Sequence, residues 1–254
     1  MMVILLLFIT GLMFGSFYNV IICRVPEGGS IVFPPSHCPQ CRKKLGVLDL
    51  IPVLSFLYLK GSCRYCGGKI SIQYPLVELI TGLFFVLLYI KFGLTLKFFV
   101  YLFLVSVLML VSVIDLKHKI IPNKITYPSL IIAVIMALFL NHISVFSSLL
   151  GILVSAGFLF LFVFFSRGRG MGMGDVKLAA VIGAVLGWKY TILGIFIGSL
   201  IGAVFGIILI FTGIIERKSR IPFGPLISLG VLISIFFGEE IINLILRINK
   251  ILWF

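Results

Sequence analysis

Long apolar runs constrain this chain more than any other feature of its sequence. A helix needs about 20 predominantly apolar residues to cross roughly 30 Å of hydrocarbon. Runs of this kind span about residues 2–22, 72–90, 97–114, 125–141, 146–165, 190–214 and 221–238, and a shorter apolar piece lies at 176–187. Because 61% of the residues are apolar, only 11% are charged and the mean hydropathy is +1.27, the chain is not a water-soluble globule. We expect an all-α polytopic membrane protein with about eight transmembrane helices.

The same pattern divides the chain into four expected parts. A first transmembrane helix spans 1–23, a polar loop domain spans 24–71, a seven-helix membrane core spans 72–238 and an amphipathic tail spans 239–254. The first run lacks a basic n-region and an Ala-x-Ala-like cleavage site, so we expect a retained helix rather than a signal peptide. The tail intersperses its apolar residues with polar ones, as an interfacial helix does.

The basic residues predict the orientation of the chain in the membrane. The chain has 21 Lys and Arg residues against 8 Asp and Glu residues, an excess that would suggest nucleic acid in a soluble domain. Here the basic residues lie mainly in the loops between the apolar runs, so we expect lipid around the helices and no nucleic-acid partner. With the N-terminus outside and every piece spanning, the outer loops before residue 239 hold only Lys91, Lys97 and Lys189. By the positive-inside rule, the polar loop domain therefore faces the cytosol.

Four of the five cysteines lie in the polar loop domain as two C-x-x-C pairs, Cys38 with Cys41 and Cys63 with Cys66. Two such pairs can give a metal ion four thiolates in a tetrahedron, and the 21 residues between them only slightly exceed the usual spacing. A loop of this size cannot be stabilised by apolar burial alone, so we expect a structural zinc ion. The alternatives are two disulfides in an outward loop, which the charge distribution contradicts, and redox chemistry at one pair.

Two aspartates lie at the ends of apolar runs. Asp115 ends one run, and Asp175 follows a glycine-rich stretch just before another. A carboxylate in a membrane segment costs about 2.5 to 3.5 kcal/mol even on the lenient scale, and the predicted topology brings both to the inner face. Such a pair can share a proton, so that one member acts as base towards water and the other as acid. The pattern therefore predicts aspartic peptide hydrolysis, and the alternative is that these residues cap helices or pair with Lys117, Lys119 or Lys177.

Several motifs together resemble the type IV prepilin peptidases, a family of membrane aspartic proteases with a Gly-x-Gly-Asp motif. The resemblance covers nearly the whole chain. The matching pieces are Gly15 to Val20 with Arg24 and Pro26, the four cysteines with Gly61 to Tyr65, Tyr74 to Glu78, Asp115 with Ile121 to Asn123, Gly172 to Leu178, and Pro222 to Pro225. The resemblance implies a bacterial cytoplasmic membrane enzyme that cleaves the basic leader of type IV prepilins or pseudopilins after a glycine, on the cytosolic side. It also implies methylation of the new N-terminal residue, usually Phe, by S-adenosylmethionine.

A site for the methyl donor is less clear from the residues. No strand followed by Gly-x-Gly-x-x-Gly is present, and there is no room for a Rossmann domain. The resemblance places the donor near the loop domain, and Asn19, Arg24, Glu27 and Glu78 are the candidate donor-binding residues. Their alternative roles are helix packing and contact with lipid headgroups. We expect Glu78 to have a partner, either a Lys or Arg of the inner loops or a substrate.

Three function classes remain on the sequence alone. The first is a combined aspartic peptidase and N-methyltransferase, the second is a protease without transferase activity, and the third is a nonenzymatic zinc-stapled transporter or assembly factor. A transporter would more readily show interrupted helices in two related halves, and no convincing internal repeat is present. The first class therefore leads.

Overall fold

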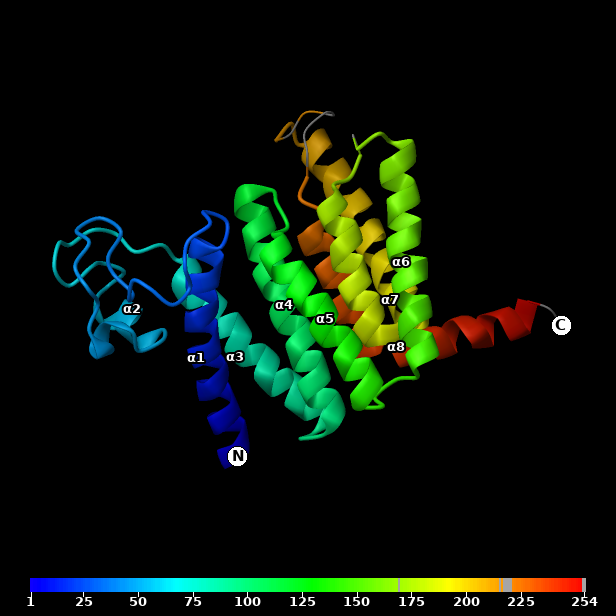
Figure 1. Ribbon diagram of the computed structural model, residues 1–254, viewed down its shortest axis with the longest axis horizontal. Coiled ribbons are helices and arrows are strands. Elements are labelled where there is room, and N and C mark those ends of the chain that lie inside the picture. The colour runs from blue at the N-terminus through cyan, green and yellow to red at the C-terminus, as the bar shows by residue number, and fades with distance from the viewer. Residues whose placement is uncertain (169, 215, 217–220, 253–254) are drawn as a thin grey trace. The chain divides into compact units, whose positions relative to one another are not determined.

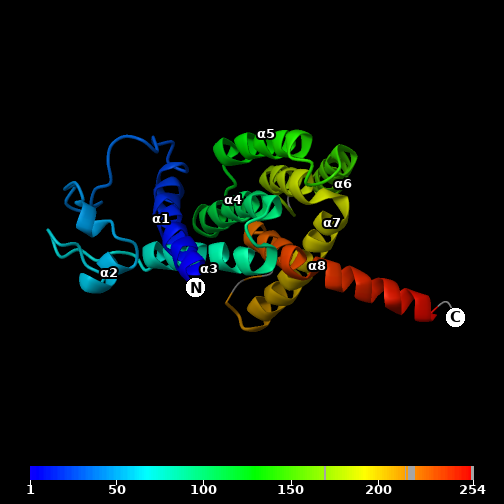
Figure 2. The same cartoon turned by 90° about the horizontal axis from the view of Figure 1, so that it is seen from below.

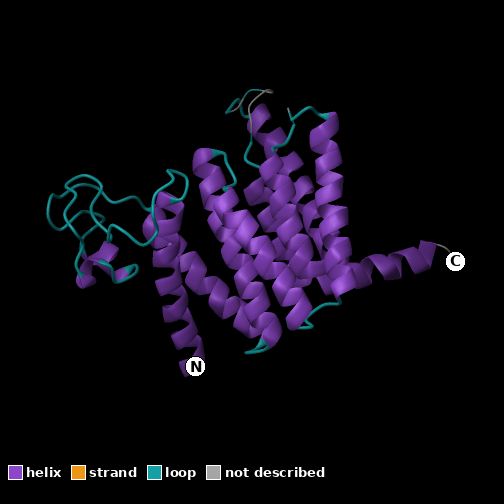
Figure 3. Cartoon of the chain, viewed as in Figure 1, coloured by secondary structure: helices purple, strands orange, loops and turns teal. Residues whose placement is uncertain are grey.

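The structure, a computed structural model, describes residues 1–254 except 169, 215, 217–220 and 253–254, and its long regular elements there are all helices. The long helices are α1 (Met2–Arg24), α3 (Gln73–Phe92), α4 (Leu96–His118), α5 (Asn123–Phe139), α6 (Val145–Phe165), α7 (Met173–Phe211) and α8 (Gly224–Leu252). Between α1 and α3 lie only the short helices η1 (Val47–Asp49) and α2 (Leu54–Tyr58). Figure 3 shows helices and loops without strands over the described residues, so the all-α prediction is confirmed.

The chain forms two compact units, Met1–Leu102 and Phe103–Phe254, and the boundary falls within α4. In the first unit α1 packs on α3. A Cβ atom at Gly11 would lie 2.7 Å from Gly82 Cα, and one at Gly15 would lie 2.6 Å from Glu78 Cα. These glycines let the two backbones approach closely, as small residues do between membrane helices.

In the second unit α7 packs on α6 and on α8 (Figures 1 and 2). The contact with α6 includes hydrogen bonds from Ser148 Oγ to Ala184 O at 2.8 Å and from Ser155 Oγ to Ala179 O at 2.9 Å. Serine hydroxyls that bond carbonyls of a neighbouring helix are typical of helix packing in lipid. The centre of this unit is apolar, with Leu178, Ile182 and Ile227 fully buried.

A break at Gly187 divides α7 into two arms. Gly187 has φ 73° and ψ 175°, which no helix contains. Thr191 Oγ1 lies 3.4 Å from Ile182 O, whereas nine residues of straight helix would span about 13.5 Å. The chain therefore folds back at Gly187, and the first arm packs on α6 while the second packs on α8 (Figure 1).

The number of spanning helices differs from the predicted eight. By length and composition, six of the described helices can cross a membrane, namely α1, α3, α4, α6, α7 and α8, and α5 is a shorter apolar helix. The predicted pieces at 176–187 and 190–214 correspond to the two arms of α7, which count as one helix because the chain re-enters helical geometry immediately after Gly187. The last helix, α8, runs without interruption from Gly224 to Leu252, past residue 239 where the amphipathic tail is predicted to begin.

Candidate active site and metal centre

The last turn of α4 presents Asp115 to the first residue of α8. The Asp115 side chain is buried, and its Oδ2 accepts a hydrogen bond of 3.0 Å from the backbone N–H of Gly224. This N–H is free to donate because the first residues of a helix have no intrahelical acceptor. The start of α8 approaches so closely that a Cβ atom at Gly224 would lie 2.9 Å from Asp115 Oδ2.

The first turn of α7 carries Asp175, three residues after Gly172, the residue that precedes the helix. Asp175 is as buried as Asp115, each being 6% exposed. The two carboxyl groups lie close enough for the charge of Asp115 to act on Asp175. Within the described part of the chain, Asp175 Oδ1 is buried and has no hydrogen-bond partner. The structure thus brings together two residues that lie sixty positions apart in the sequence (175 − 115 = 60).

Lysine pairing does not explain the two aspartates. The salt bridge found in the described residues joins Arg64 to Asp49, not a lysine to Asp115 or Asp175. Lys177 instead donates a 2.7 Å hydrogen bond to Asn123 Oδ1. Two shielded carboxyl groups without a cationic partner are the arrangement in which a pair shares one proton and activates water.

The four cysteines of the loop domain meet in one cluster. The sulfurs of Cys38, Cys41, Cys63 and Cys66 all lie within 4.8 Å of one another, and Cys38 Sγ is 3.9 Å from Cys66 Sγ. A tetrahedral zinc ion with Zn–S bonds of about 2.3 Å has sulfurs about 3.8 Å apart, so the cluster fits this metal. All four thiols are free, which argues against the disulfide alternative.

Each C-x-x-C pair is a tight turn. Cys38 N donates to Lys43 O at 3.0 Å, and Cys63 N donates to Gly68 O at 2.8 Å. Isolated bridges between His37 and Lys44 and between Ser62 and Lys69 close the two turns. Backbone N–H groups, chiefly that of Cys41, lower the pKa of the Cys38 thiol to about 7, which favours the thiolate that a metal binds.

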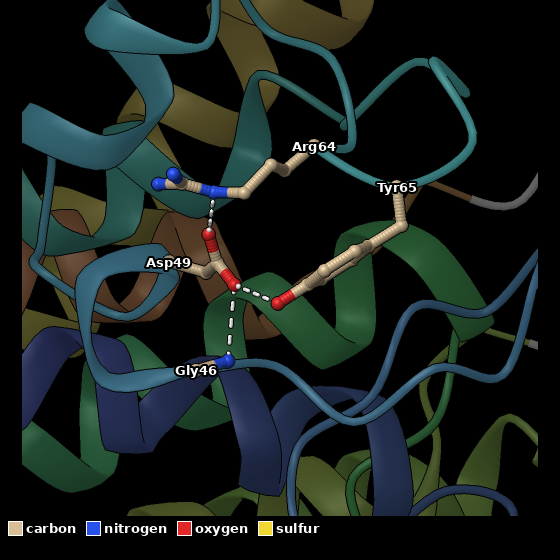
Figure 4. A network of polar contacts seen from close by, with 4 residues as sticks. All are labelled: Gly46, Asp49, Arg64 and Tyr65. Atoms are coloured by element: carbon tan, nitrogen blue, oxygen red, sulfur yellow. Dashed lines mark hydrogen bonds and ion pairs between the residues drawn. The ribbon is translucent and has the colours of Figure 1, made fainter.

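The Asp49 carboxylate links the second turn to the segment that follows the first turn, as Figure 4 shows. Asp49 accepts hydrogen bonds from Gly46 N at 3.0 Å, from Arg64 Nε at 2.7 Å and from the Tyr65 hydroxyl at 3.1 Å. Arg64 and Tyr65 are the two residues between Cys63 and Cys66. Burial acts to raise the pKa of the Asp49 carboxyl, but the three hydrogen bonds outweigh it and hold this pKa below its usual value. Asp49 therefore fixes the second C-x-x-C pair against the segment that follows the first.

The candidate donor-binding residues lie around the contact of α1 with α3. Asn19 is buried, donates to Tyr74 O at 3.0 Å and accepts from Gln73 Nε2 at 3.3 Å. Glu78 is buried one helical turn after Tyr74. Arg24 Nη1, at the end of α1, donates to Ser30 O at 3.0 Å, and Glu27 is exposed. The structure thus places Asn19 and Glu78 at one helix contact, and neither Arg24 nor Glu27 contacts them through a described hydrogen bond or ion pair.

Glu78 has a partner that is not a cation. Its Oε2 accepts a 2.8 Å hydrogen bond from the backbone N–H of Val53. Val53 precedes α2 with φ 62° and ψ −50°, a conformation that a β-branched residue rarely adopts. Glu78 therefore ties the loop domain to α3 at a strained position. Sequence reasoning did not identify Val53, and it included Gly224 only within the matching piece Pro222 to Pro225, because neither residue contributes a functional side chain.

Comparisons with known proteins agree with this arrangement. Residues 9–92 match the family model described as the bacterial peptidase A24 N-terminal domain, and residues 102–207 match the one described as the type IV leader peptidase family. A Bacillus subtilis protein named prepilin leader peptidase/N-methyltransferase is 40% identical over 95% of this chain and 97% of its own length. Proteins of the same name from Aeromonas salmonicida and Pseudomonas aeruginosa are 33% and 32% identical, over 93% and 91% of this chain and 91% and 89% of their own lengths. No solved structure matches the chain.

Proposed function

Because this chain belongs to the type IV leader peptidase family, we propose that it removes the leader peptide of type IV prepilins and related pseudopilins and methylates the new N-terminus. The observation that carries the proteolytic half is the pair of buried aspartates at the ends of α4 and α7. The names of the similar proteins support both halves.

In the proteolytic step, Asp115 and Asp175 act on one water molecule. The ionised member takes a proton as the water oxygen attacks the scissile carbonyl carbon, and the protonated member donates a hydrogen bond to the carbonyl oxygen. Collapse of the tetrahedral intermediate then transfers a proton to the leaving amine. The N–H of Gly224 holds the Asp115 carboxyl group in place through its Oδ2.

Zinc is the metal that the four cysteines fit best. Cys38, Cys41, Cys63 and Cys66 would hold it, and with four thiolates no position remains for substrate. Its role would therefore be structural, supplying folding free energy to the loop domain.

S-adenosylmethionine supplies an electrophilic methyl group when bound. Asn19, Arg24, Glu27 and Glu78 are the residues we propose to hold it. The buried Glu78 carboxylate accepts a backbone N–H and has no salt-bridge partner in the described residues, so a cationic sulfonium would compensate its charge. Beside Asn19, Gln73 Oε1 is buried without a hydrogen-bond partner there, and a ligand donor would satisfy it.

The orientation we propose is that of a bacterial cytoplasmic membrane protein, with the loop domain and the aspartates facing the cytosol. The distribution of Lys and Arg supports it, and so does the position of Asp115 and Asp175 at helix ends that meet. The reduced cysteine cluster also suits the cytosol, where thiols stay reduced.

The test is to incubate the purified enzyme with a prepilin and labelled S-adenosylmethionine, beside a pilin that has already lost its leader. We expect cleavage of the first substrate and label transfer to both. Glu78→Gln should keep the oxygen acceptor for Val53, retain cleavage and lose label transfer, because the carboxylate charge is gone. Cleavage without any label transfer would leave a protease alone, and an intact prepilin would overturn the proposed function.

A further inference from the structure

Two residues near the aspartates form a contact that the proposed mechanism does not use. Lys177 Nζ on α7 donates a 2.7 Å hydrogen bond to Asn123 Oδ1, at the first residue of α5. The same ammonium group lies 4.9 Å from the centroid of the Tyr127 ring, one turn further along α5. We call the Asn123–Lys177 contact the clasp.

The clasp joins the two segments that carry the acids. Asp115 lies in the last turn of α4, and the short linker 119–122 leads from α4 to Asn123. Lys177 lies in the same first turns of α7 as Asp175. The clasp therefore links residues 115–123 to residues 175–177, and this short link limits how far the two carboxyl groups can separate.

The direction of the side chains fits a tether on the side of α7 away from the acid. Residues 175 and 177 point about 200° apart around a helix, so Lys177 faces α5 while Asp175 faces Asp115. The linker also lies directly against α7, since a Cβ atom at Gly174 would be 2.7 Å from Ile121 Cβ. The first turn of α7 is thus confined between the linker and the clasp.

We propose that Lys177 and Asn123 are positioning residues of the peptidase, which hold the carboxyl group of Asp175 in a fixed position relative to that of Asp115. This inference rests on the proposed function. A displacement of about 1 Å in a reacting group can lower a rate by about 100-fold, so a tether of this kind has a large effect without touching substrate.

The experiment measures cleavage and amide exchange in Lys177→Met, Asn123→Ala and the double variant. Each single variant should lower kcat by about 10- to 100-fold with little change in KM, and the double variant should be no worse than either, since both remove one contact. Lys177→Arg, which keeps the cation and the ring contact, should recover part of the loss. The control is Lys189→Met, because Lys189 also stacks on an aromatic ring of α7, Trp188 at 5.6 Å, but in the other arm.

Hydrogen exchange in peptides that cover residues 173–182 gives a readout that needs no catalysis. We expect exchange to be faster than in the wild type for Lys177→Met and Asn123→Ala, and to be unchanged for Lys189→Met. Unchanged exchange together with unchanged kcat, or losses that add in the double variant, would overturn the clasp. If the wild-type enzyme does not cleave prepilin, the proposed function fails, while exchange still decides whether the clasp orders α7.

Discussion

At the scale of the residue, the contact between Gly224 and Asp115 closely constrains the candidate site. The Gly224 N–H is 3.0 Å from Asp115 Oδ2, and the space beside it admits no side chain. Glu78 shows a second case in which a backbone group decides the environment of an acid, because its partner is the N–H of Val53.

Gly224→Ala should lower kcat by about 10-fold and leave KM nearly unchanged. The added Cβ would lie 2.9 Å from Asp115 Oδ2, so the carboxyl group must shift while the peptide N–H remains. Steady-state cleavage of a prepilin measures this, with Gly157→Ala on α6 as the control, since nothing lies within 4 Å of a Cβ there. Equal activity of the two variants would show that the close approach at Gly224 is unimportant.

The sequence sufficed to predict the acidic pair and the four cysteines but not their surroundings. Asp115 and Asp175 could be identified because carboxylates in membrane segments are rare and costly, and the cysteines because their spacing is specific. The partner of Glu78 was expected among Lys, Arg or a substrate, and the structure gives a backbone N–H instead. Backbone donors of this kind depend on local φ and ψ angles, here a positive φ at Val53, which side-chain identities do not specify.

At the scale of the element, α7 and the loop domain differ in what stabilises them. The fold-back of α7 depends on one residue, since Gly187 has a positive φ and its Cα faces Ser147 Oγ so closely that a Cβ could not fit. Because the break is one residue long and leaves no polar loop, the two arms count as one long helix. The loop domain instead has its cysteine cluster and the hydrogen bonds of Asp49.

Gly187→Ala should lower the Tm of the enzyme in detergent more than Gly93→Ala does. Both glycines have backbone angles that other residues adopt at a cost of about 1 to 3 kcal/mol. A Cβ at Gly187 would also clash with Ser147, whereas nothing lies within 4 Å of one at Gly93. Equal shifts of Tm would contradict the close packing of the fold-back on α6.

Asp49→Asn should weaken zinc binding by about 10-fold or more, because Arg64 and Tyr65 lose the carboxylate that positions them between Cys63 and Cys66. The pKa of Asp49 is lowered in the folded loop, so its contribution to stability is complete above the unfolded pKa of about 3.9 and is lost only as the pH falls below that value. The ratio of the zinc affinities of the wild type and Asp49→Asn should therefore be the same at pH 7 and pH 6. Competition with a zinc chelator measures this ratio. Equal zinc affinities of the two proteins at pH 6 would contradict the lowered pKa.

At the scale of the whole molecule, the two proposed chemistries use different parts of the chain. The aspartates and the clasp belong to residues 103–254, whereas the cysteine cluster and Glu78 belong to residues 1–102. Composition and charge predicted a polytopic helical membrane protein, and the six helices that can span confirm this class. Loss of proteolysis should therefore leave methyl transfer intact, provided that the substrate has already lost its leader.

The most direct test of the central claim is single-turnover cleavage of a prepilin by Asp115→Asn, Asp175→Asn and the double variant. We predict that each single substitution lowers the rate by about 10³-fold or more, and that the double variant is no slower than either, because the two carboxyl groups act as a unit. Methyl transfer to a pilin without its leader should stay at the wild-type rate in all three. Cleavage within about 10-fold of wild type by either single variant would contradict a joint role for Asp115 and Asp175.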